Sequence, residues 1–284
     1  MAIQFSRVVT TQAERVAERF AARNVPLREF GDAASPLIMA HNFRLRGRPF
    51  GPHPHAGFSV LSYVFEDSAA SLRSRDSLGH DITMGAGGVV WTQAARGLVH
   101  HEIAADHTAH LHGLQCFVNM ASKNKVAAPR VMWLEPGAVP EWHGRAGDRV
   151  RIAVGSYEGL SSPLEPIERF DFFDMYLQRE VPLHLRPGWN TLIYVLEGIA
   201  IVHADGRDLQ IGAEHVVAIR GEGTRAAIQS SPSAHVVIMA GAAIREPVLA
   251  SGPFIMSTQA EMEDALRRYH AGDMGDLAPL PDEE

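Results

Sequence analysis

The sequence predicts an all-β protein of two barrels, because its apolar residues fall mostly in short runs and because one set of strand and turn residues occurs twice. Apolar runs of about four to eight residues, rich in valine, isoleucine and aromatic residues and separated by turns with glycine, are typical of strands. The clearest runs span residues 58–65, 88–92, 111–120, 191–202, 215–219 and 235–239. A chain of 284 residues is also long enough for two domains that each bury a core.

The internal repeat matches part of the first half of the chain with part of the second half. Tyr63-Val64-Phe65-Glu66 corresponds to Tyr194-Val195-Leu196-Glu197, and Gly79-His80-Asp81 corresponds to Gly206-Arg207-Asp208. Gly85-Ala86 followed by Val89-Val90 likewise corresponds to Gly212-Ala213 followed by Val216-Val217. The shared order and nearly equal spacing predict one barrel in each half. We place the N-terminal barrel at residues 1–133 and the C-terminal barrel at residues 134–284, with the changeover inside 132–166.

Two short helices are expected, one near each end of the chain. Apolar residues at helical spacing follow the N-cap candidate Thr11 and predict the N-terminal helix; they are Ala13, Val16, Ala17, Phe20 and Ala21. Thr258 and Glu261 have the spacing of a capping box at the start of the C-terminal helix, and Gly272 ends it. Its apolar face consists of Met262, Ala265, Leu266 and Tyr269. Residues 273–284 are acidic and predict a loosely held tail.

Charge and composition exclude several classes of protein. Lysine and arginine total 26 against 33 aspartate and glutamate, so the net charge is −7, and no basic block is available to neutralise a row of phosphates. We therefore expect no direct nucleic-acid partner. The N-terminus has no apolar signal core and the chain has no apolar run of about 18 residues, which predicts no membrane span. Cys116 is the only cysteine, so we expect a cytoplasmic protein in which Cys116 is a small buried core residue.

His53-Pro54-His55 and His100-His101-Glu102 each place two metal-ligating side chains two residues apart. Residues i and i+2 of a strand point to the same face, about 6.6 Å apart along the chain, so two such pairs on facing strands can reach one ion. His101 would point the other way, and Pro54, which has no N–H, fits an edge strand at a barrel rim. Imidazole nitrogen and carboxylate oxygen suit Fe(II), Mn(II), Ni(II), Cu(II) or Zn(II) at about 2.0 to 2.3 Å. The spacing therefore predicts one transition-metal site at His53, His55, His100 and Glu102.

The second copy of the repeat is an internal control for this site. Counting along the aligned copies places His184 and Arg186 where the first copy has His53 and His55, and it places Ala227 and Gln229 where the first copy has His100 and Glu102. We therefore expect no comparable metal site in the C-terminal barrel.

The alternative is that these histidines are solvated or hydrogen-bonded surface residues, because a chain with 15 histidines will contain some HxH patterns by chance. His110-Leu111-His112 is such a pattern, and no second ligand pair stands at matching spacing beside it. We interpret it as a pair that could orient a metal ligand by a hydrogen bond rather than bind the metal.

The chain resembles the pirin family of bicupins. Gly51-Pro52-His53-Pro54-His55-Ala56-Gly57-Phe58 is similar to that family's PHPHRGF strand, with Ala56 in place of the usual arginine. Further similar segments are Arg75-Asp76-Ser77-Leu78-Gly79, Ala95-Arg96-Gly97-Leu98-Val99-His100-His101-Glu102, His112-Gly113-Leu114-Gln115 and Gly252-Pro253-Phe254-Ile255-Met256. The resemblance implies two cupin barrels packed face to face, with one iron in the N-terminal barrel. The family's metal ligands fall on His53, His55, His100 and Glu102.

The resemblance leaves two functional hypotheses. In the first, the protein is a quercetin 2,3-dioxygenase-like enzyme that cleaves a flavonol with O₂ at the metal, and Glu102 is the catalytic residue that accepts the proton of the substrate hydroxyl. In the second, it is an iron-binding regulatory protein whose oxidation state changes its affinity for a protein partner. A structural bicupin with an idle metal ranks third. The fold alone does not decide among these roles.

Overall fold

The computed structural model describes residues 3–17, 19–221, 223 and 225–280, and it divides the chain into two compact units. Unit 1 contains the residues up to Gln12, Asn24–Ile38 and Ala138–Arg245. Unit 2 contains Ala13–Arg23, Met39–Gly137 and the residues from Glu246 onward. The division between residues 133 and 134 stays a prediction. The C-terminal segment from Glu246, however, groups with residues of the first half of the chain.

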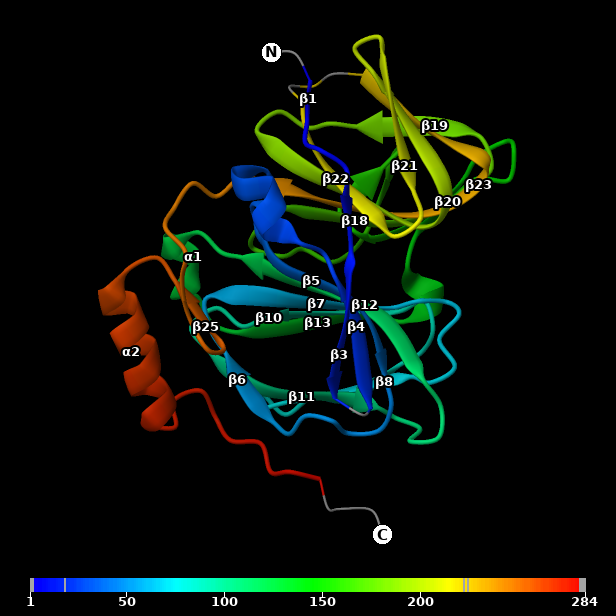
Figure 1. Cartoon of the computed structure of the whole chain (residues 1–284). Helices are drawn as coiled ribbons and strands as arrows, with labels where there is room; N and C mark the ends of the chain where they lie inside the picture. Colours follow the sequence, from blue (N-terminus) through cyan, green and yellow to red (C-terminus); the bar gives the residue numbers. More distant parts are fainter. Residues whose placement is uncertain (1–2, 18, 222, 224, 281–284) are drawn as a thin grey trace. The chain divides into compact units, whose positions relative to one another are not determined.

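Unit 2 is built from a larger and a smaller sheet (Figure 1). The larger sheet has the order β13-β10-β7-β12-β5-β4-β3. Its strands are β3 (Gln12–Ala17), β4 (Phe20–Asn24), β5 (Leu37–Leu45), β7 (Phe58–Val64), β10 (Val89–Gln93), β12 (Leu111–Asn119) and β13 (Arg130–Leu134). The smaller sheet has the order β6-β11-β8-β9, and its strands are β6 (His53–His55), β8 (Leu72–Asp76), β9 (Asp81–Met84) and β11 (Leu98–Ala104).

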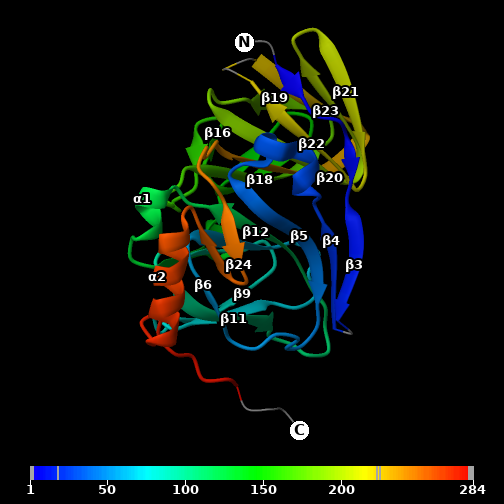
Figure 2. The same cartoon turned by 60° about the vertical axis from the view of Figure 1, so that its left-hand side comes forward.

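Short elements complete unit 2 beside these sheets. The helix α1 (Ser122–Lys125) follows β12, and the hairpin of β24 (Leu249–Ser251) and β25 (Phe254–Met256) leads into the helix α2 (Gln259–His270). Both views show α1, α2 and this hairpin at the same side of the unit (Figures 1 and 2). An isolated bridge between Ala56 and Phe254 joins the hairpin to the chain that follows β6.

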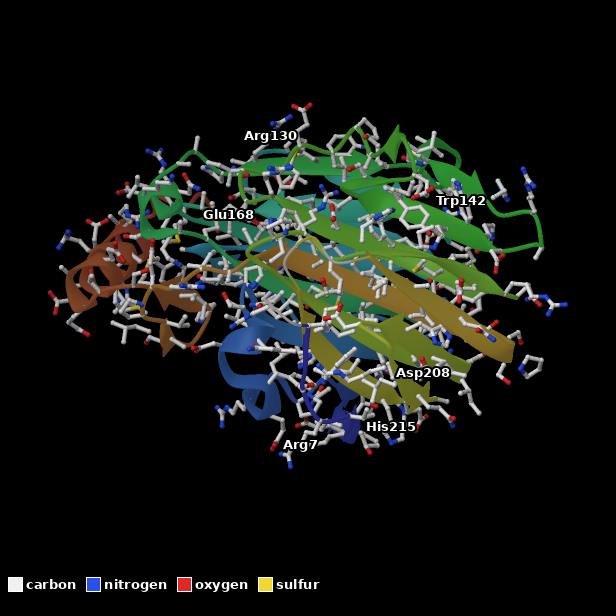
Figure 3. All side chains as sticks on the ribbon, turned by 90° about the horizontal axis from the view of Figure 1, so that it is seen from above. Arg7, Arg130, Trp142, Glu168, Asp208 and His215 are labelled. Carbon is white, nitrogen blue, oxygen red and sulfur yellow. The ribbon has the colours of Figure 1, made fainter. Side chains whose placement is uncertain are left out.

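Unit 1 contains a sheet of order β1-β22-β20-β23-β18-β15-β14, with β2, β19 and β21 paired at its sides. Its strands are β1 (Gln4–Phe5), β2 (Val9–Thr10), β14 (Glu141–His143), β15 (Arg149–Val154), β18 (Phe170–Leu177), β19 (Glu180–His184), β20 (Trp189–Ala204), β21 (Arg207–Gly212), β22 (His215–Arg220) and β23 (Arg225–Ala242). The remaining elements are the small hairpin of β16 (Ser156–Tyr157) and β17 (Leu160–Ser161) and the 3₁₀ helices η1 (Leu27–Ala34) and η2 (Pro136–Ala138). Trp142 on β14, Asp208 on β21 and His215 on β22 are labelled in Figure 3.

Strand pairing confirms the internal repeat residue by residue. Tyr63 pairs with Val89 in unit 2, and the corresponding Tyr194 pairs with Val216 in unit 1. Each tyrosine is fully buried. The repeated segments therefore occupy equivalent places in the two units, and the all-β prediction is confirmed.

The predicted helix over residues 13–21 is wrong. Residues 12–17 form β3 and residues 20–24 form β4. In the larger sheet β4 lies beside β5 and β3 lies beside β4, while residue 18 lies outside the described residues. Helical spacing of small apolar residues is a weak preference that tertiary packing can override. Here the backbone of β4 pairs with β5, and Phe20 of β4 lines a pocket.

The C-terminal helix is confirmed with both hydrogen bonds of its capping box. The Thr258 side chain accepts from the backbone N–H of Glu261, and the Glu261 carboxylate accepts from the backbone N–H of Thr258. Met262 and Ala265 are buried, whereas Tyr269 is 41% exposed. Over the described ranges, no helix combines the length and apolar character needed to cross a membrane.

Candidate metal centre

The two predicted ligand pairs lie on neighbouring strands of the smaller sheet in unit 2. β6 and β11 pair antiparallel, and this register sets His53 directly opposite His100 and His55 opposite Leu98. Glu102, further along β11, lies opposite Ser74 of β8. β6 is an edge strand of this sheet, as the missing N–H of Pro54 predicts.

The imidazoles of His53, His55 and His100 converge. Each offers a nitrogen, and these ligand atoms all lie within 4.8 Å of one another. The Nε2 atoms of His53 and His100 are 3.1 Å apart. Two ligand atoms that share an ion at about 2.1 Å lie about 3.0 Å apart in octahedral geometry and about 3.4 Å apart in tetrahedral geometry. The spacing of this pair therefore fits two ligands of one metal ion.

The hydrogen bond of His53 to the backbone fixes which of its nitrogens can bind an ion. Nδ1 of His53 lies 2.9 Å from the carbonyl oxygen of Gly51, which can only accept. The ring hydrogen therefore belongs on Nδ1, and Nε2 presents its lone pair toward His100. This is the common way in which a protein orients a metal-binding imidazole.

Burial keeps the other two rings in the neutral form that binds metals. His55 is 5% exposed, and burial, reinforced by the nearby His53, lowers its pKa to about 3. His100 is 1% exposed, and burial, reinforced by the nearby His55, His53 and His101, lowers its pKa well below the usual value. Within the described part of the chain, the buried Nδ1 of His55 has no hydrogen-bond partner. A hydrogen bond between the His55 ring and the backbone of Pro253 opposes the lowering of its pKa by burial.

Glu102 faces the same cavity but is not one of the three converging side chains. Its Oε2 accepts hydrogen bonds from Ser62 Oγ at 2.7 Å and from Gln115 Nε2 at 2.9 Å, while its Oε1 accepts a longer one from Ser74 Oγ at 3.5 Å. Burial raises the pKa of Glu102, and these hydrogen bonds oppose that shift. Oε1, with the weaker hydrogen bond, is the oxygen better placed to change partner.

A cavity of about 620 Å³ opens beside these groups. Its polar side chains are His41, His53, His100, Glu102 and Gln115. The apolar wall consists of Phe20, Phe43, Leu45, Phe50 and Leu72. This wall was not predicted, because Phe20 was assigned to a helix and because its members are spread over residues 20–72. The cavity joins a candidate metal centre to a surface suited to a flat apolar molecule.

The remaining histidines of the sequence prediction have other partners. His101 turns away from the converging rings, as predicted, and its Nε2 donates to the carbonyl of Phe50 at 2.9 Å. His112 lies between Asp67, at 2.6 Å from Nδ1, and Asn42, at 2.9 Å from Nε2. Cys116 is buried as expected, and burial raises the pKa of its thiol.

The equivalent strand of unit 1 carries different chemistry. His184 pairs with Arg225 across β19 and β23. The residue in the position of His100 is therefore Arg225, whereas counting along the repeat predicted Ala227. Nε2 of His184 lies 2.6 Å from Glu158, and Arg186 donates to the Asp171 carboxylate at 2.8 Å. Among the described residues, the only group of three potential ligands is His53, His55 and His100.

Comparison with known proteins finds matches over both halves of the chain. The family model described as Pirin matches residues 10–118, and the model described as Pirin C-terminal cupin domain matches residues 172–275. Human pirin is 31% identical over 238 residues, which cover 81% of this chain and 80% of that protein. Pirin-like protein 2 of Arabidopsis thaliana is 31% identical over 249 residues, which cover 84% of this chain and 75% of that protein.

Solved structures show the same fold. A quercetin 2,3-dioxygenase from Acinetobacter baumannii superposes with a TM-score of 0.84 at 22% identity, covering 98% of this chain and 100% of that chain. A bacterial pirin from Escherichia coli in complex with nickel(II) superposes with a TM-score of 0.64 at 18% identity, covering 85% of this chain and 100% of that chain. These likenesses confirm the predicted architecture of two cupin domains.

Proposed function

Since the chain belongs to the pirin family, we propose that it is a metal-dependent dioxygenase that cleaves flavonols in the manner of a quercetin 2,3-dioxygenase. The observation that supports this proposal most is the convergence of the imidazoles of His53, His55 and His100, because His53 and His100, with Nε2 atoms 3.1 Å apart, line a cavity that also has aromatic rings in its wall.

We assign His53, His55, His100 and Glu102 as the residues that hold the metal. Fe(II) is the ion we favour, and the nitrogen and oxygen donors also suit Mn(II), Ni(II), Cu(II) and Zn(II). The ion, when bound, would polarise the substrate hydroxyl. It would also assist the reaction with O₂, which an organic substrate undergoes only slowly by itself. Three imidazoles and one carboxylate leave room at such an ion for further ligands.

Glu102 is the candidate base. A flavonol must lose the proton of its 3-hydroxyl to become electron-rich enough for attack on O₂, and a carboxylate with a raised pKa is a better acceptor for that proton. Burial supplies the raised pKa of Glu102. Ser62 and Gln115 hold Oε2, so Oε1 is left to take the proton. In the overall reaction, both oxygen atoms of O₂ enter the cleaved product and the carbon that carried the 3-hydroxyl leaves as carbon monoxide.

The aromatic wall would orient the substrate and exclude water. Phe20 packs edge-on against Phe50, with ring centroids 5.1 Å apart, and lies over Phe43 at 6.1 Å. Flat aromatic molecules pack well against such rings. A flavonol bound here would place its hydroxyl toward Glu102 and His100 while its rings cover the apolar side.

Aerobic turnover of quercetin by iron-loaded protein tests the proposal. Oxygen uptake with release of carbon monoxide in equal amounts is the expected result, and both should be lost in His55→Ala together with the bound metal. Turnover that survives removal of the metal would contradict the proposed mechanism. Stable iron binding without oxygen uptake on any flavonol would favour the regulatory hypothesis instead.

A further inference from the structure

Lys125 is a charged side chain buried in unit 2 with oxygen atoms around its ammonium group. It ends α1 and is 2% exposed. Its Nζ donates to the carbonyl of Gly57 at 2.7 Å, to Oδ1 of Asn119 at 2.7 Å and to the carbonyl of Ile255 at 3.0 Å. A buried ammonium is costly unless its donors are satisfied, and three good acceptors satisfy the three donors of a lysine. A site built this completely indicates a specific structural task.

All three acceptors belong to chain segments that surround His55. Gly57 is two residues beyond His55. Ile255 lies on β25, which runs beside the chain after β6, since the Ile255 N–H donates to the carbonyl of Ala56 at 3.0 Å. The ammonium of Lys125 therefore fixes the backbone immediately after His55 against the C-terminal hairpin.

The third acceptor connects Lys125 to the aromatic packing of the His55 ring. Asn119 pairs with Phe58 across β7 and β12. Ring centroids place His55 5.0 Å from Phe58 and 5.3 Å from Phe117, and these two phenyl rings are 4.6 Å apart. The His55 imidazole therefore packs against Phe58 of β7 and Phe117 of β12. Asn119, which pairs with Phe58 where these two strands meet, accepts the hydrogen bond from Lys125.

Gly57 allows this close assembly. Its φ of +88° is a left-handed value, and a Cβ added there would lie 1.8 Å from the carbonyl oxygen of Ile255. Only glycine lets the two backbone segments approach so closely that both carbonyls reach one ammonium group. Two backbone carbonyls brought together would repel each other, and the positive charge of Lys125 offsets that repulsion.

We propose that Lys125 is a positioning residue for the metal ligand His55: it ties the backbone after His55, the end of β12 and the C-terminal strand β25 together, so that the His55 ring is held where His53 and His100 converge. This inference rests on the proposed metal site. It also assigns a functional task to the C-terminal hairpin, which lies more than a hundred residues after β12 in the sequence and packs beside the chain that follows His55.

Binding of Co(II) to purified full-length variants tests the proposal, because the ion reports both its affinity and the arrangement of its ligands through visible absorption. Lys125→Met keeps the length of the side chain and removes its charge and donors. We expect an affinity about 10- to 100-fold weaker than that of the parent protein, with an altered absorption spectrum, as for other residues that orient metal ligands. Lys123→Met on the same helix is the matched control, since Lys123 is exposed, and it should leave affinity and spectrum unchanged.

Circular dichroism at the temperature of the titration separates positioning from folding. If Lys125→Met does not fold, Asn119→Ala, which leaves the two backbone acceptors in place, takes over the test with the same expected direction. A folded variant with a lower melting temperature but the parent's Co(II) affinity and spectrum would overturn the inference, because Lys125 would then serve stability alone. A parent protein that binds no Co(II) would refute the proposed metal site and with it this role of Lys125.

Discussion

Gln115 and Glu102 are joined by a hydrogen bond of 2.9 Å that runs from the larger sheet to the smaller sheet of unit 2. Gln115 lies on β12 and Glu102 on β11, and these strands belong to different sheets. The amide also donates to Ser62 Oγ at 3.2 Å. Gln115 therefore favours the ionised form of the candidate base from the opposite side of the barrel.

The first prediction concerns the pH dependence of turnover in Gln115→Leu. The hydrogen bond from Gln115 lowers the pKa of Glu102 against the larger effect of burial, so its removal should raise that pKa further. A base acts only in its ionised form, and the acid limb of the kcat/KM profile should therefore move to higher pH. Gln259→Leu, at an exposed position of α2, is the control and should keep the parent profile. A Gln115→Leu profile identical to the parent's would remove Glu102 from the role of base.

The second prediction concerns the stability of the metal-free protein in acid. The pKa of His55 is lowered to about 3 and that of His100 also lies well below the usual value, whereas in the unfolded chain both rings titrate near about 6.5. Below about pH 6.5 the unfolded state therefore binds more protons than the folded state, and stability falls as the pH falls. Each ring adds a slope of up to about 1.4 kcal/mol per pH unit.

Urea unfolding of His55→Gln at pH 7.5, 6.5, 5.5 and 4.5 measures this contribution. The variant should lose less stability than the parent between pH 6.5 and pH 4.5, because one of the two buried rings no longer titrates. His143→Gln, whose side chain is 65% exposed, serves as control and should follow the parent. Parallel curves for His55→Gln and the parent would show that His55 is not held neutral by burial.

The third prediction compares two glycines with similar backbone angles. Gly57 and Gly79 have φ values of +88° and +98°, but an added Cβ at Gly57 would meet the carbonyl oxygen of Ile255 at 1.8 Å, whereas at Gly79 nothing lies within 4 Å. Gly79→Ala should cost about 1 to 2 kcal/mol of unfolding free energy from the backbone angle alone. Gly57→Ala should cost more than that, about 3 kcal/mol or more, because the hairpin must also move. Equal losses in chemical denaturation would mean that the contact with β25 is easily relieved.

The fourth prediction concerns the aromatic wall. Phe20 lines the cavity from a strand that carries none of the proposed ligands, so Phe20→Ala should weaken flavonol binding without changing metal affinity. A rise of about tenfold in Kd corresponds to about 1.4 kcal/mol, a reasonable share of one aromatic contact. Fluorescence titration with quercetin measures it, and Leu160→Ala, a partly exposed apolar residue of unit 1, is the control. An unchanged Kd would place the flavonol elsewhere.

The sequence alone predicted the strand-spaced residues of the candidate site, because those residues are close along the chain and obey a simple period. His53 and His55 on one strand and His100 on its neighbour converge as the spacing requires. Glu102 shows the limit of this reasoning, since spacing placed it on the correct face but did not reveal the hydrogen bonds of Ser62 and Gln115 that hold its carboxylate.

The features that were missed depend on segments far apart in the sequence. The Lys125 site joins residues 57, 119, 125 and 255, and no local pattern indicates that such segments meet. The strand at Phe20 was missed for a related reason, because β4 pairs with β5, which lies later in the chain. Local spacing cannot anticipate a partner strand supplied from elsewhere.

The grouping of the segment from Glu246 with unit 2 has a consequence for how the protein matures. A ribosome delivers the chain from its N-terminus, and domains usually fold in that order as they emerge. Here the strand β25 that carries Ile255 emerges only after all of the residues of unit 1. The proposed ligand histidines are made well before the β25 carbonyl that bonds to Lys125, so we expect the metal to be loaded only after β25 has been synthesised.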